Sequence, residues 1–364
     1  MSSITSPISH LTFRMATSFF LVVGTIVSIN SIGLNFAATA FAQQPQANFT
    51  SAEQQLPTDG NSFEIDNVTF SHRTASVNGI YLHYVIGGQG DPLVLLHGWP
   101  QTWYEWRLVM PALAKNYTVI APDLRGLGDS SKPPTGYDGK TVAEDIHQLV
   151  TQLGFNSIFL VGHDAGVWVA YPYAAAHPTE VKGLAVWEAP VPGFFPPGTI
   201  PINSTFAGFP PWWVAFHQTP EVPETLVQGQ ELEYLSWFYQ NLAFNPAAIT
   251  QEAINEYVSK YSIPGGMRAG FEYYRAIPQD AMQNQNYSKT NLTMPVLTLQ
   301  GGFVPTFGGN ITMSATEYSI RQLAENVTSI TVPNSGHWIA EEQPDFLVKV
   351  LNNFFRGNST TSGG

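Results

Sequence analysis

The chain has 364 residues, of which 44% are hydrophobic and 12% are charged, and its formal net charge is −12. This length accommodates one large hydrophobic core and an inserted subdomain. Because the balance is acidic and no basic run exists, nucleic acid and anionic membrane surfaces are not expected as partners. The chain has no cysteine, which excludes a thiol nucleophile, a disulfide framework and any cysteine-based metal site.

The first 42 residues have the pattern of a secretory signal peptide. Arg14 is their only charged residue, Phe19–Ile29 is an apolar stretch, and residues 40–42 (Ala-Phe-Ala) fit a small-x-small cleavage site. The apolar stretch is short for a membrane span, although an uncleaved anchor is the alternative. We expect cleavage after Ala42, a secreted, extracellular protein, and no stable membrane association after cleavage.

The segments on either side of the expected folded region are polar. Residues 43–64 contain proline and are interpreted as a linker, and residues 357–364 are expected to form a disordered tail. Asn-x-Ser/Thr sequons, which suit an extracellular surface, begin at Asn48, Asn67, Asn203, Asn286, Asn291, Asn310, Asn326 and Asn358.

From residue 65 onward, short apolar strands alternate with helices. Asn78-Gly79 is a strong hairpin signal, and Thr141-x-x-Glu144 is a capping box that opens a helix. A closing helix is expected over Pro344–Phe355. The strands are expected at Val68–Val77, Ile80–Ile86, Pro92–Leu96, Tyr117–Pro122, Ser157–Val161, Val181–Trp187, Met294–Leu299 and Val327–Val332. This order predicts an α/β fold with a mostly parallel eight-stranded sheet and helices on both faces.

The alternation stops between residues 192 and 282, which are rich in proline and aromatic residues. We expect a helical cap here, inserted between a first core part, residues 65–191, and a second core part, residues 283–356. Such a cap would cover the carboxyl ends of the strands, where ligands bind in open α/β sheets. Most of its aromatic rings are expected to form the cap's own core, and its low charge suggests a small apolar substrate.

Asp164 occupies the most informative position in the chain. The stretch Gly162-His163-Asp164-Ala165-Gly166 joins an apolar strand to a helix in the small-x-nucleophile-x-small pattern of a nucleophile elbow. Its glycines are needed because the turn is sharp and the helix is close. A carboxylate at the apex can displace a leaving group from carbon and form an ester. A Gly-Asp pair is also common in ordinary loops, so the interpretation depends on partner residues.

An ester on Asp164 requires a general base for water and a group that orients the base. His337 follows the last strand, which gives the chain order nucleophile, acid, histidine. Residues 299–315, after the seventh strand, contain no Asp or Glu. Glu188 ends the sixth strand, and a carboxylate there is costly unless it is paired. We therefore expect Glu188 to orient His337.

Two backbone N–H groups are candidates for an oxyanion hole. Trp99 follows the third strand, and Ala165 lies at the amino end of the helix after the nucleophile. They would hold a carboxylate oxygen of Asp164 and the oxyanion formed during ester hydrolysis. None of these steps uses a cofactor or a metal ion, and we expect neither.

Four ordered motifs resemble those of the epoxide hydrolases of the α/β-hydrolase superfamily and the related haloalkane and fluoroacetate dehalogenases. They are His97-Gly98-Trp99-Pro100, residues 123–133, Gly162-His163-Asp164 and Gly336-His337-Trp338. The similarity extends from about Val68 to Phe355 and implies the α/β-hydrolase fold with its cap. It implies an enzyme that opens epoxides to vicinal diols through Asp164. It also implies that Tyr274 donates a proton to the epoxide oxygen, for which a phenol with a pKa of about 10 is suited.

The chain departs from these families at several positions. Trp213 stands where the nearest relatives carry a second donor, His or Tyr, and His217 is the alternative donor. Trp212 and His163 are further candidates for substrate binding. Haloalkane dehalogenases usually have Trp and Asn where this chain has Ala165 and Trp99. A dehalogenase with the same nucleophile, and a secreted binding protein without catalysis, therefore stay as alternatives, and a homodimer is left open.

Overall fold

The computed structural model describes residues 61–196, 212–302 and 313–359. The expected signal peptide, residues 1–42, lies outside the described residues, as do residues 43–60 of the expected linker and residues 360–364 of the expected tail. In the part of the chain that is described, no helix combines the length and the apolar character that a membrane span requires.

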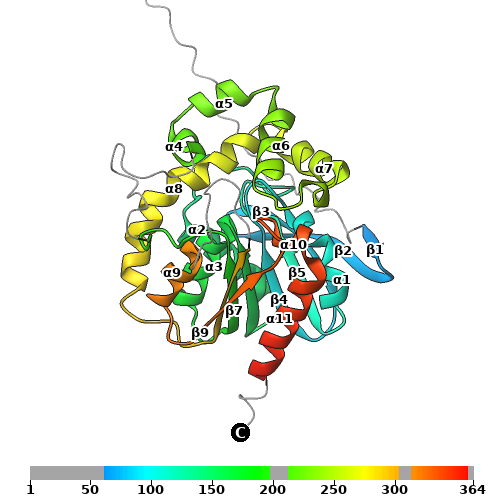
Figure 1. The fold of residues 1–364 in the computed structure, drawn as a ribbon, viewed down its shortest axis with the longest axis vertical. Helices are drawn as coiled ribbons and strands as arrows, with labels where there is room; N and C mark the ends of the chain where they lie inside the picture. Colours follow the sequence, from blue (N-terminus) through cyan, green and yellow to red (C-terminus); the bar gives the residue numbers. More distant parts are fainter. Residues whose placement is uncertain (1–60, 197–211, 303–312, 360–364) are drawn as a thin grey trace, which may run out of the picture. The chain divides into compact units, whose positions relative to one another are not determined.

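A nine-stranded sheet forms the centre of the fold, with the strand order β1-β2-β3-β5-β4-β6-β7-β8-β9 (Figure 1). The pairs β1–β2, β2–β3 and β3–β5 are antiparallel, and all the other neighbours are parallel. The strands are β1 Ser62–Ile65, β2 Val68–Val77, β3 Ile80–Gly88, β4 Asp91–Leu96, β5 Tyr117–Pro122, β6 Ile158–His163, β7 Val181–Trp187, β8 Val296–Gly301 and β9 Val327–Val332. The mostly parallel sheet expected from the sequence is confirmed, with β1 as an additional strand.

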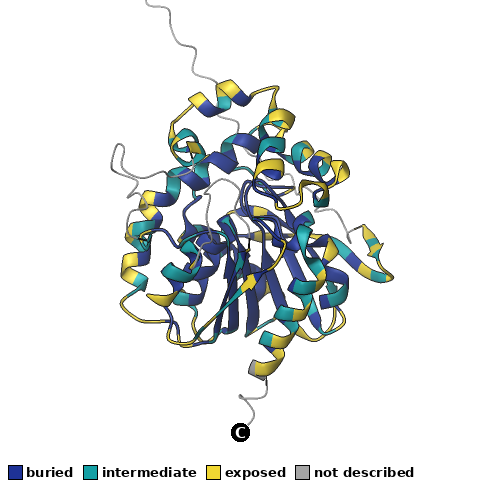
Figure 2. Cartoon of the chain, in the orientation of Figure 1, coloured by how far each residue is buried: buried dark blue, intermediate teal, exposed yellow. Residues whose placement is uncertain are grey.

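The two faces of the sheet bury two separate hydrophobic cores, because successive side chains of a strand point to opposite faces. In β4, Leu93 and Leu95 belong to one core and Val94 and Leu96 to the other. The first core contains residues of α1 (Met110–Leu113) and α11 (Pro344–Ser359). The second contains residues of α2 (Gly139–Gln152), α3 (Ala165–Ala176) and α9 (Ala315–Arg321). Figure 2 shows the strands between these helices as the most continuously buried part of the chain.

The cap helices lie over one end of the sheet (Figure 1). They are α4 Trp212–Gln218, α5 Val222–Val227, α6 Glu231–Asn241, α7 Gln251–Tyr261 and α8 Gly266–Tyr287. The second core part begins with β8 and ends with the short helix α10 (Ile339–Glu342) followed by α11. The inserted helical region expected from the sequence is therefore present.

Several expected boundaries are corrected by the structure. β1 lies within the expected linker, where it pairs with β2 and packs Phe63 and Ile65 against the first core. Helix α2 begins at Gly139, because the side chain of Asp138, not that of Thr141, caps it. Helix α8 continues past residue 282, since Asn284 is buried and donates a hydrogen bond to the carbonyl of Pro192.

The last helix is also longer than expected. α11 continues to Ser359 and so includes the first residues of the expected tail. Phe355 is fully buried one turn earlier, which anchors this end of the helix against the sheet.

Candidate active site

The turn between β6 and α3 places Asp164 at the carboxyl edge of the sheet. Asp164 has a φ of +49° and a ψ of −118°, a conformation that costs energy in any residue with a side chain. A Cβ atom at Gly162 would lie 2.6 Å from the carbonyl oxygen of Gly166, and one at Gly166 would overlap the carbonyl oxygen of Leu96. The two glycines are therefore required by the close approach of the helix to the sheet, as expected from the motif.

The two carboxylate oxygens of Asp164 have different surroundings. Oδ1 accepts a hydrogen bond from the backbone N–H of Trp99 at 2.9 Å. Ala165 is the first residue of α3, so its N–H has no acceptor within the helix. Oδ2 faces Nε2 of His337 at 3.8 Å. Oδ1 is therefore held by the backbone, whereas Oδ2 is turned toward the histidine.

Glu188 lies directly after β7 and contacts the other side of the His337 ring. Its Oε2 lies 3.3 Å from Nδ1 of His337, and its Oε1 accepts a hydrogen bond from the backbone N–H of Gly301 at 2.7 Å. Gly301 is the last residue of β8, the strand after which the sequence offers no acid. The structure thus brings Asp164, Glu188 and His337 together, each in the loop that follows a different parallel strand.

The loop that carries His337 is joined to the cap. The N–H of His337 donates to the carbonyl of Leu242 at 2.9 Å. The N–H of Gly336 donates to Oε1 of Glu342 at 2.8 Å, and the N–H of Asn245 donates to Oε2 of the same carboxylate at 2.8 Å. Because Leu242 and Asn245 follow α6, the position of the histidine depends on the docking of this part of the cap.

His163 does not occupy the substrate-binding position expected from the sequence. It is buried, its Nδ1 lies 2.8 Å from Oε1 of Glu105, and its Nε2–H donates to the carbonyl of His337 at 3.0 Å. Burial alone would lower its pKa, but the charge of Glu105, followed by Asp164 and Glu188, raises the pKa above the ordinary value. Both ring nitrogens contact groups of the protein, so His163 positions the loop of His337 and does not contact substrate.

No motif in the sequence indicated Glu105, which connects His163 to the loop that contains Gly98 and Trp99. Its Oε2 accepts a hydrogen bond from the N–H of Gly98 at 3.0 Å, next to the N–H of Trp99 that holds Asp164. The available signal was an acidic residue among bulky aromatic neighbours, residues 103–106, where a buried carboxylate requires a partner.

Tyr274, in α8, is buried against the rings that surround the nucleophile. Its ring centroid lies 4.4 Å from that of His217, 5.5 Å from that of Trp99 and 5.4 Å from that of Trp168. Burial, followed by the charge of Asp164, raises its pKa well above 10. The raised pKa keeps this phenol protonated.

The structure separates the alternatives for a second donor. His217 is fully buried, its Nε2 lies 2.5 Å from the hydroxyl of Tyr234, and its Nδ1 has no partner among the described residues. Burial, followed by the charge of Arg275, lowers its pKa well below 6.5, so the ring is neutral. No motif in the sequence indicated Tyr234, because a tyrosine on a cap helix has no distinguishing pattern.

Trp212 and Trp213 lie one layer farther from Tyr274. Trp212 is 47% exposed. The ring of Trp213 packs against Phe238 at 5.4 Å and Trp237 at 6.0 Å. The structure therefore brings His217 against Tyr274 and leaves the two tryptophans in the outer aromatic cluster of the cap, which favours His217 of the two donors that the sequence left open.

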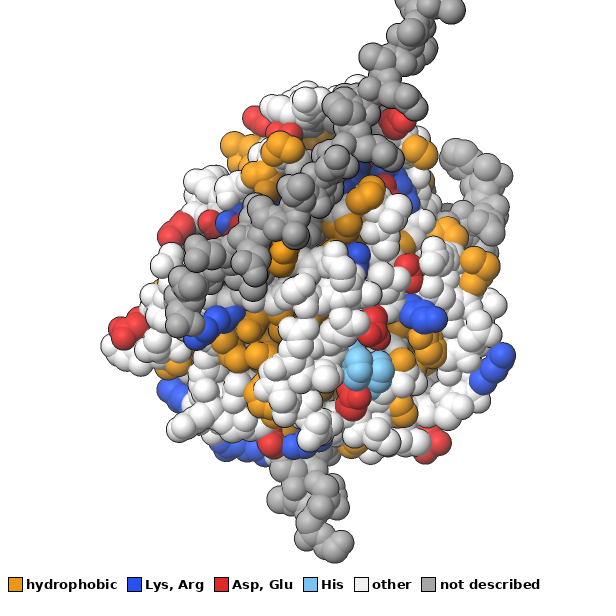
Figure 3. Space-filling model, turned by 180° about the vertical axis from the view of Figure 1, so that it is seen from behind, with side chains coloured by type: hydrophobic (Ala, Val, Ile, Leu, Met, Phe, Trp, Pro, Cys, Tyr) orange, Lys and Arg blue, Asp and Glu red, His pale blue; other side chains and the backbone are white. Residues whose placement is uncertain are grey.

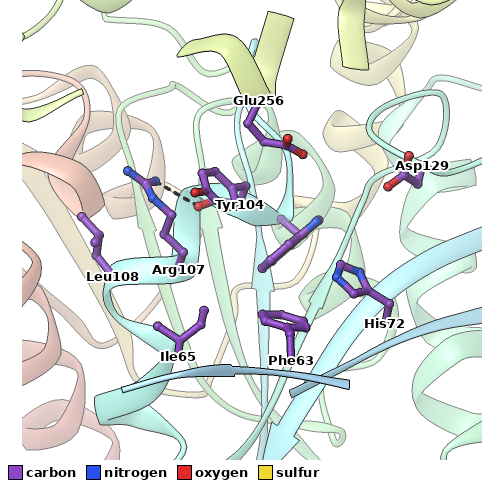
Figure 4. Close-up of a pocket in the computed structure, with 9 residues that line it drawn as sticks. Phe63, Ile65, His72, Tyr104, Arg107, Leu108, Asp129 and Glu256 are labelled. Carbon is purple, nitrogen blue, oxygen red and sulfur yellow. Dashed lines mark hydrogen bonds between the residues drawn. The ribbon is translucent and has the colours of Figure 1, made fainter. Parts of the chain in front are cut away.

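A separate surface cavity of about 420 Å³ lies away from the catalytic residues, beside β1 and the 3₁₀ helix η1 (Trp103–Leu108). In Figure 4, the side chains of Arg107 and Tyr104 lie together on its wall. Arg107 donates to the Tyr104 carbonyl and to Glu341, and Asp129 accepts from Lys260. Since its charged groups are already paired, we assign the cavity no ligand.

A model of the α/β hydrolase fold family matches residues 91–344. The chain belongs to this family. It is 38% identical to the soluble epoxide hydrolase of Corynebacterium sp. (strain C12) over 296 residues. This alignment covers 78% of this chain and 97% of the relative. Wild-type Cfl2 from Burkholderia cenocepacia, whose crystal structure is known, is 39% identical to this chain in sequence. The two structures superpose with a TM-score of 0.73, and the match covers 82% of this chain and 100% of Cfl2. The chain is an epoxide hydrolase-like enzyme of the α/β hydrolase fold family.

A relative with another named activity matches less of the chain. The fluoroacetate dehalogenase of a Burkholderia species is 32% identical over 218 residues, which cover 57% of this chain and 69% of the relative.

Proposed function

We propose that this α/β-hydrolase opens epoxides to vicinal diols through a covalent ester on Asp164. In the first step Oδ2 of Asp164 attacks a carbon of the epoxide ring, and the bond from that carbon to the ring oxygen breaks. The electron pair stays on the oxygen, which takes a proton from the hydroxyl of Tyr274. The relative named as a soluble epoxide hydrolase supports this substrate class.

In the second step water hydrolyses the ester. Nε2 of His337 removes a proton from the water, which attacks the ester carbonyl carbon. The negative charge forms on Oδ1, where the N–H of Trp99 already donates and the N–H of Ala165 can join it. The intermediate then collapses, the bond from Cγ to Oδ2 breaks, and Oδ2 leaves in the diol with the proton that His337 took from the water. The carboxylic acid left on Asp164 loses its proton to solvent and solvent returns one to Tyr274, so that both groups are restored. Glu188 stabilises the positive charge on the histidine, at 3.3 Å.

The observation that carries this proposal is the state of Tyr274. An epoxide becomes an alkoxide when its ring opens, so the reaction needs a proton donor, whereas a departing halide needs only hydrogen bonds. The phenol of Tyr274 packs against the rings of Trp99 and His217, and its pKa is raised by burial and by Asp164. It is therefore protonated near the nucleophile, as a general acid must be.

His217 supplies the second hydrogen bond in this proposal. If the hydroxyl of Tyr234 donates to Nε2, the neutral ring carries its proton on Nδ1, the nitrogen that has no partner in the described chain. A substrate oxygen held between Tyr274 and His217 would satisfy both donors. The surrounding rings of Trp99, Trp168 and Phe271 favour an apolar substrate.

A dehalogenase that uses the same nucleophile is the second candidate, favoured by the identity to the fluoroacetate dehalogenase. The position after the nucleophile is Ala165, whose side chain cannot donate a hydrogen bond to a halide. Tyr274 and His217 would then donate hydrogen bonds to the halide ion, and the phenol would transfer no proton.

A substrate panel tests the proposal. Aryl and alkyl epoxides and matched bromo- and fluoro-substituted compounds are incubated with the wild-type enzyme and with Asp164→Asn. We expect diol formation from epoxides by the wild-type enzyme and none by the variant. Release of halide without diol formation would support the dehalogenase instead, and absence of turnover with every compound would contradict both enzymes.

We also propose that the protein is secreted. The Asn side chains of the sequons at positions 67, 286, 291 and 326 are exposed, as attached glycans would require. In the natural host, the mature protein should begin near Gln43. An intact mass that includes residues 1–42 would contradict secretion with cleavage.

A further inference from the structure

A second group of ligand-bearing side chains lies at the far end of the nucleophile helix. His177 follows the last residue of α3, Glu180 lies in the turn before β7, and His147 projects from α2. One possible ligand atom from each of them lies within 4.8 Å of the other two. Figure 3 shows histidine side chains next to acidic side chains at one place on this face of the molecule.

The contacts within this group direct both histidines toward one carboxylate. Nδ1 of His147 lies 3.1 Å from Oε2 of Glu180, and Nδ1 of His177 lies 3.5 Å from Oε1. The two imidazole rings are stacked, with their centroids 3.9 Å apart and an interplanar angle of 5°. Each of the three side chains is about a quarter exposed, which leaves access for an ion and for water.

The backbone around the group is fixed by hydrogen bonds. The N–H of Glu180 donates to the carbonyl of His177 at 3.0 Å, and the N–H of Ile158, at the start of β6, donates to the carbonyl of Glu180 at 2.7 Å. The hydroxyl of Tyr173 donates to Oε2 of Glu180 at 3.0 Å. Such a bond orients a carboxylate as the outer partners of metal ligands commonly do. His177 and Glu180 therefore belong to one hydrogen-bonded turn.

We propose that His147, His177 and Glu180 form a binding site for a divalent transition-metal ion, with Zn²⁺ as the best match. Imidazole nitrogen together with one carboxylate is a donor set that suits Zn²⁺ and its first-row neighbours. Ligands about 2.0–2.2 Å from a tetrahedral Zn²⁺ stand roughly 3.3 Å from one another. The observed separations of 3.1 and 3.5 Å are close to that spacing. A rotation of the stacked rings would aim both Nδ1 atoms at one ion, and water would complete the tetrahedron.

The position of the site defines its role. A bound ion would join α2, the end of α3 and the entry to β7, and Asp164 begins the opposite end of α3. The site therefore stabilises the fold and takes no part in the reaction of the proposed hydrolase. Ion binding raises the free energy of unfolding in proportion to the logarithm of the ion concentration above its Kd.

The test uses chelator-treated full-length protein without a histidine tag. Titration with Zn²⁺ is followed by calorimetry, and the Tm is measured with and without the ion. We expect one Zn²⁺ per chain and an increase in Tm of roughly 5 °C at about 100 times the Kd. His147→Gln and, separately, Glu180→Gln should weaken binding at least about 10-fold and remove the Tm increase.

The control is His337→Gln, which removes the histidine of the catalytic group and should leave Zn²⁺ binding unchanged. Absence of binding in the wild-type protein would overturn the proposal. So would binding that persists in both His147→Gln and Glu180→Gln, or binding that disappears in His337→Gln. Hydrolysis by the metal-free protein measures the proposed function separately, so either proposal can fail alone.

Discussion

The groups at the sheet edge are held by polar bonds, whereas the two candidate donors of the cap are held mainly by packed aromatic rings. Asp164 accepts from the N–H of Trp99, and Glu188 accepts from the N–H of Gly301 while contacting His337. Tyr274 and His217 instead lie in edge-to-face contact, with one polar bond between His217 and Tyr234. In the proposed mechanism, the residues of the sheet edge would form and hydrolyse the ester, and those of the cap would protonate the epoxide oxygen.

At the sheet edge, Glu188→Gln should lower turnover more than any variant of the cap. Glutamine can still accept from Gly301, but its amide nitrogen can face Nδ1 of His337, which disturbs the tautomer that a general base needs. Steady-state turnover should fall about 10³-fold or more. Formation of the ester does not use the base, so rapid mixing should show a burst of one epoxide consumed per enzyme. A slow reaction without a burst would place Glu188 in the first step instead.

In the cap, Tyr274→Phe should lower epoxide turnover by roughly 10²-fold, the scale of a general acid. The matched control is Tyr273→Phe, one residue earlier, where the hydroxyl donates to the carbonyl of Arg125 at 2.8 Å. The control should cost about 1 kcal/mol of stability and leave turnover nearly unchanged. Equal turnover in the two variants would remove Tyr274 from the reaction.

A smaller effect on kcat/KM distinguishes His217, which contacts Tyr274, from Trp213, which lies farther out in the cap. His217→Phe keeps an aromatic ring and removes one hydrogen bond to the substrate oxygen, so kcat/KM should fall roughly 10-fold. Trp213→Phe lies in the outer layer and should change kcat/KM by less than about 3-fold. The reverse order of effects would favour Trp213 over His217 as the second donor.

The last expected effect is on stability, at a contact between the cap and the core. Asp280 of α8 is buried, accepts from the N–H of Gly139 at 2.7 Å, and has a pKa raised by burial from 3.8 to about 8. Between these pH values the unfolded chain loses a proton that the folded chain keeps, so stability falls as pH rises. Asp280→Asn should therefore raise the Tm more at pH 8 than at pH 5. An equal change at both pH values would contradict the raised pKa.

Motifs predicted the sheet edge better than the cap. The Gly-x-Asp-x-Gly spacing located Asp164, and the absence of an acid in residues 299–315 directed attention to Glu188. Both positions follow from backbone geometry that a short motif encodes. Trp213 and His217 lie four residues apart on one helix, so the pattern alone could not choose between them. Their contacts depend on how α4 packs against α8, which is a tertiary property.

Strand β1 and two contacts between distant residues could not be predicted from local sequence patterns. β1 has four residues, too few for its alternation to stand out from a polar linker. The contacts of His163 with Glu105 and of His147 with Glu180 join residues that are 58 and 33 positions apart. Such pairs become visible only when the strands and helices are assembled, because nothing in the local sequence links them.

The most direct test of the central claim is the intact mass of His337→Gln after mixing with an epoxide. Without its base, the enzyme should still form the ester but hydrolyse it slowly. We predict a mass increase of one substrate molecule, located on the peptide that contains Asp164. Consumption of epoxide in a single turnover with no added mass, or with the added mass on another peptide, would contradict the covalent mechanism.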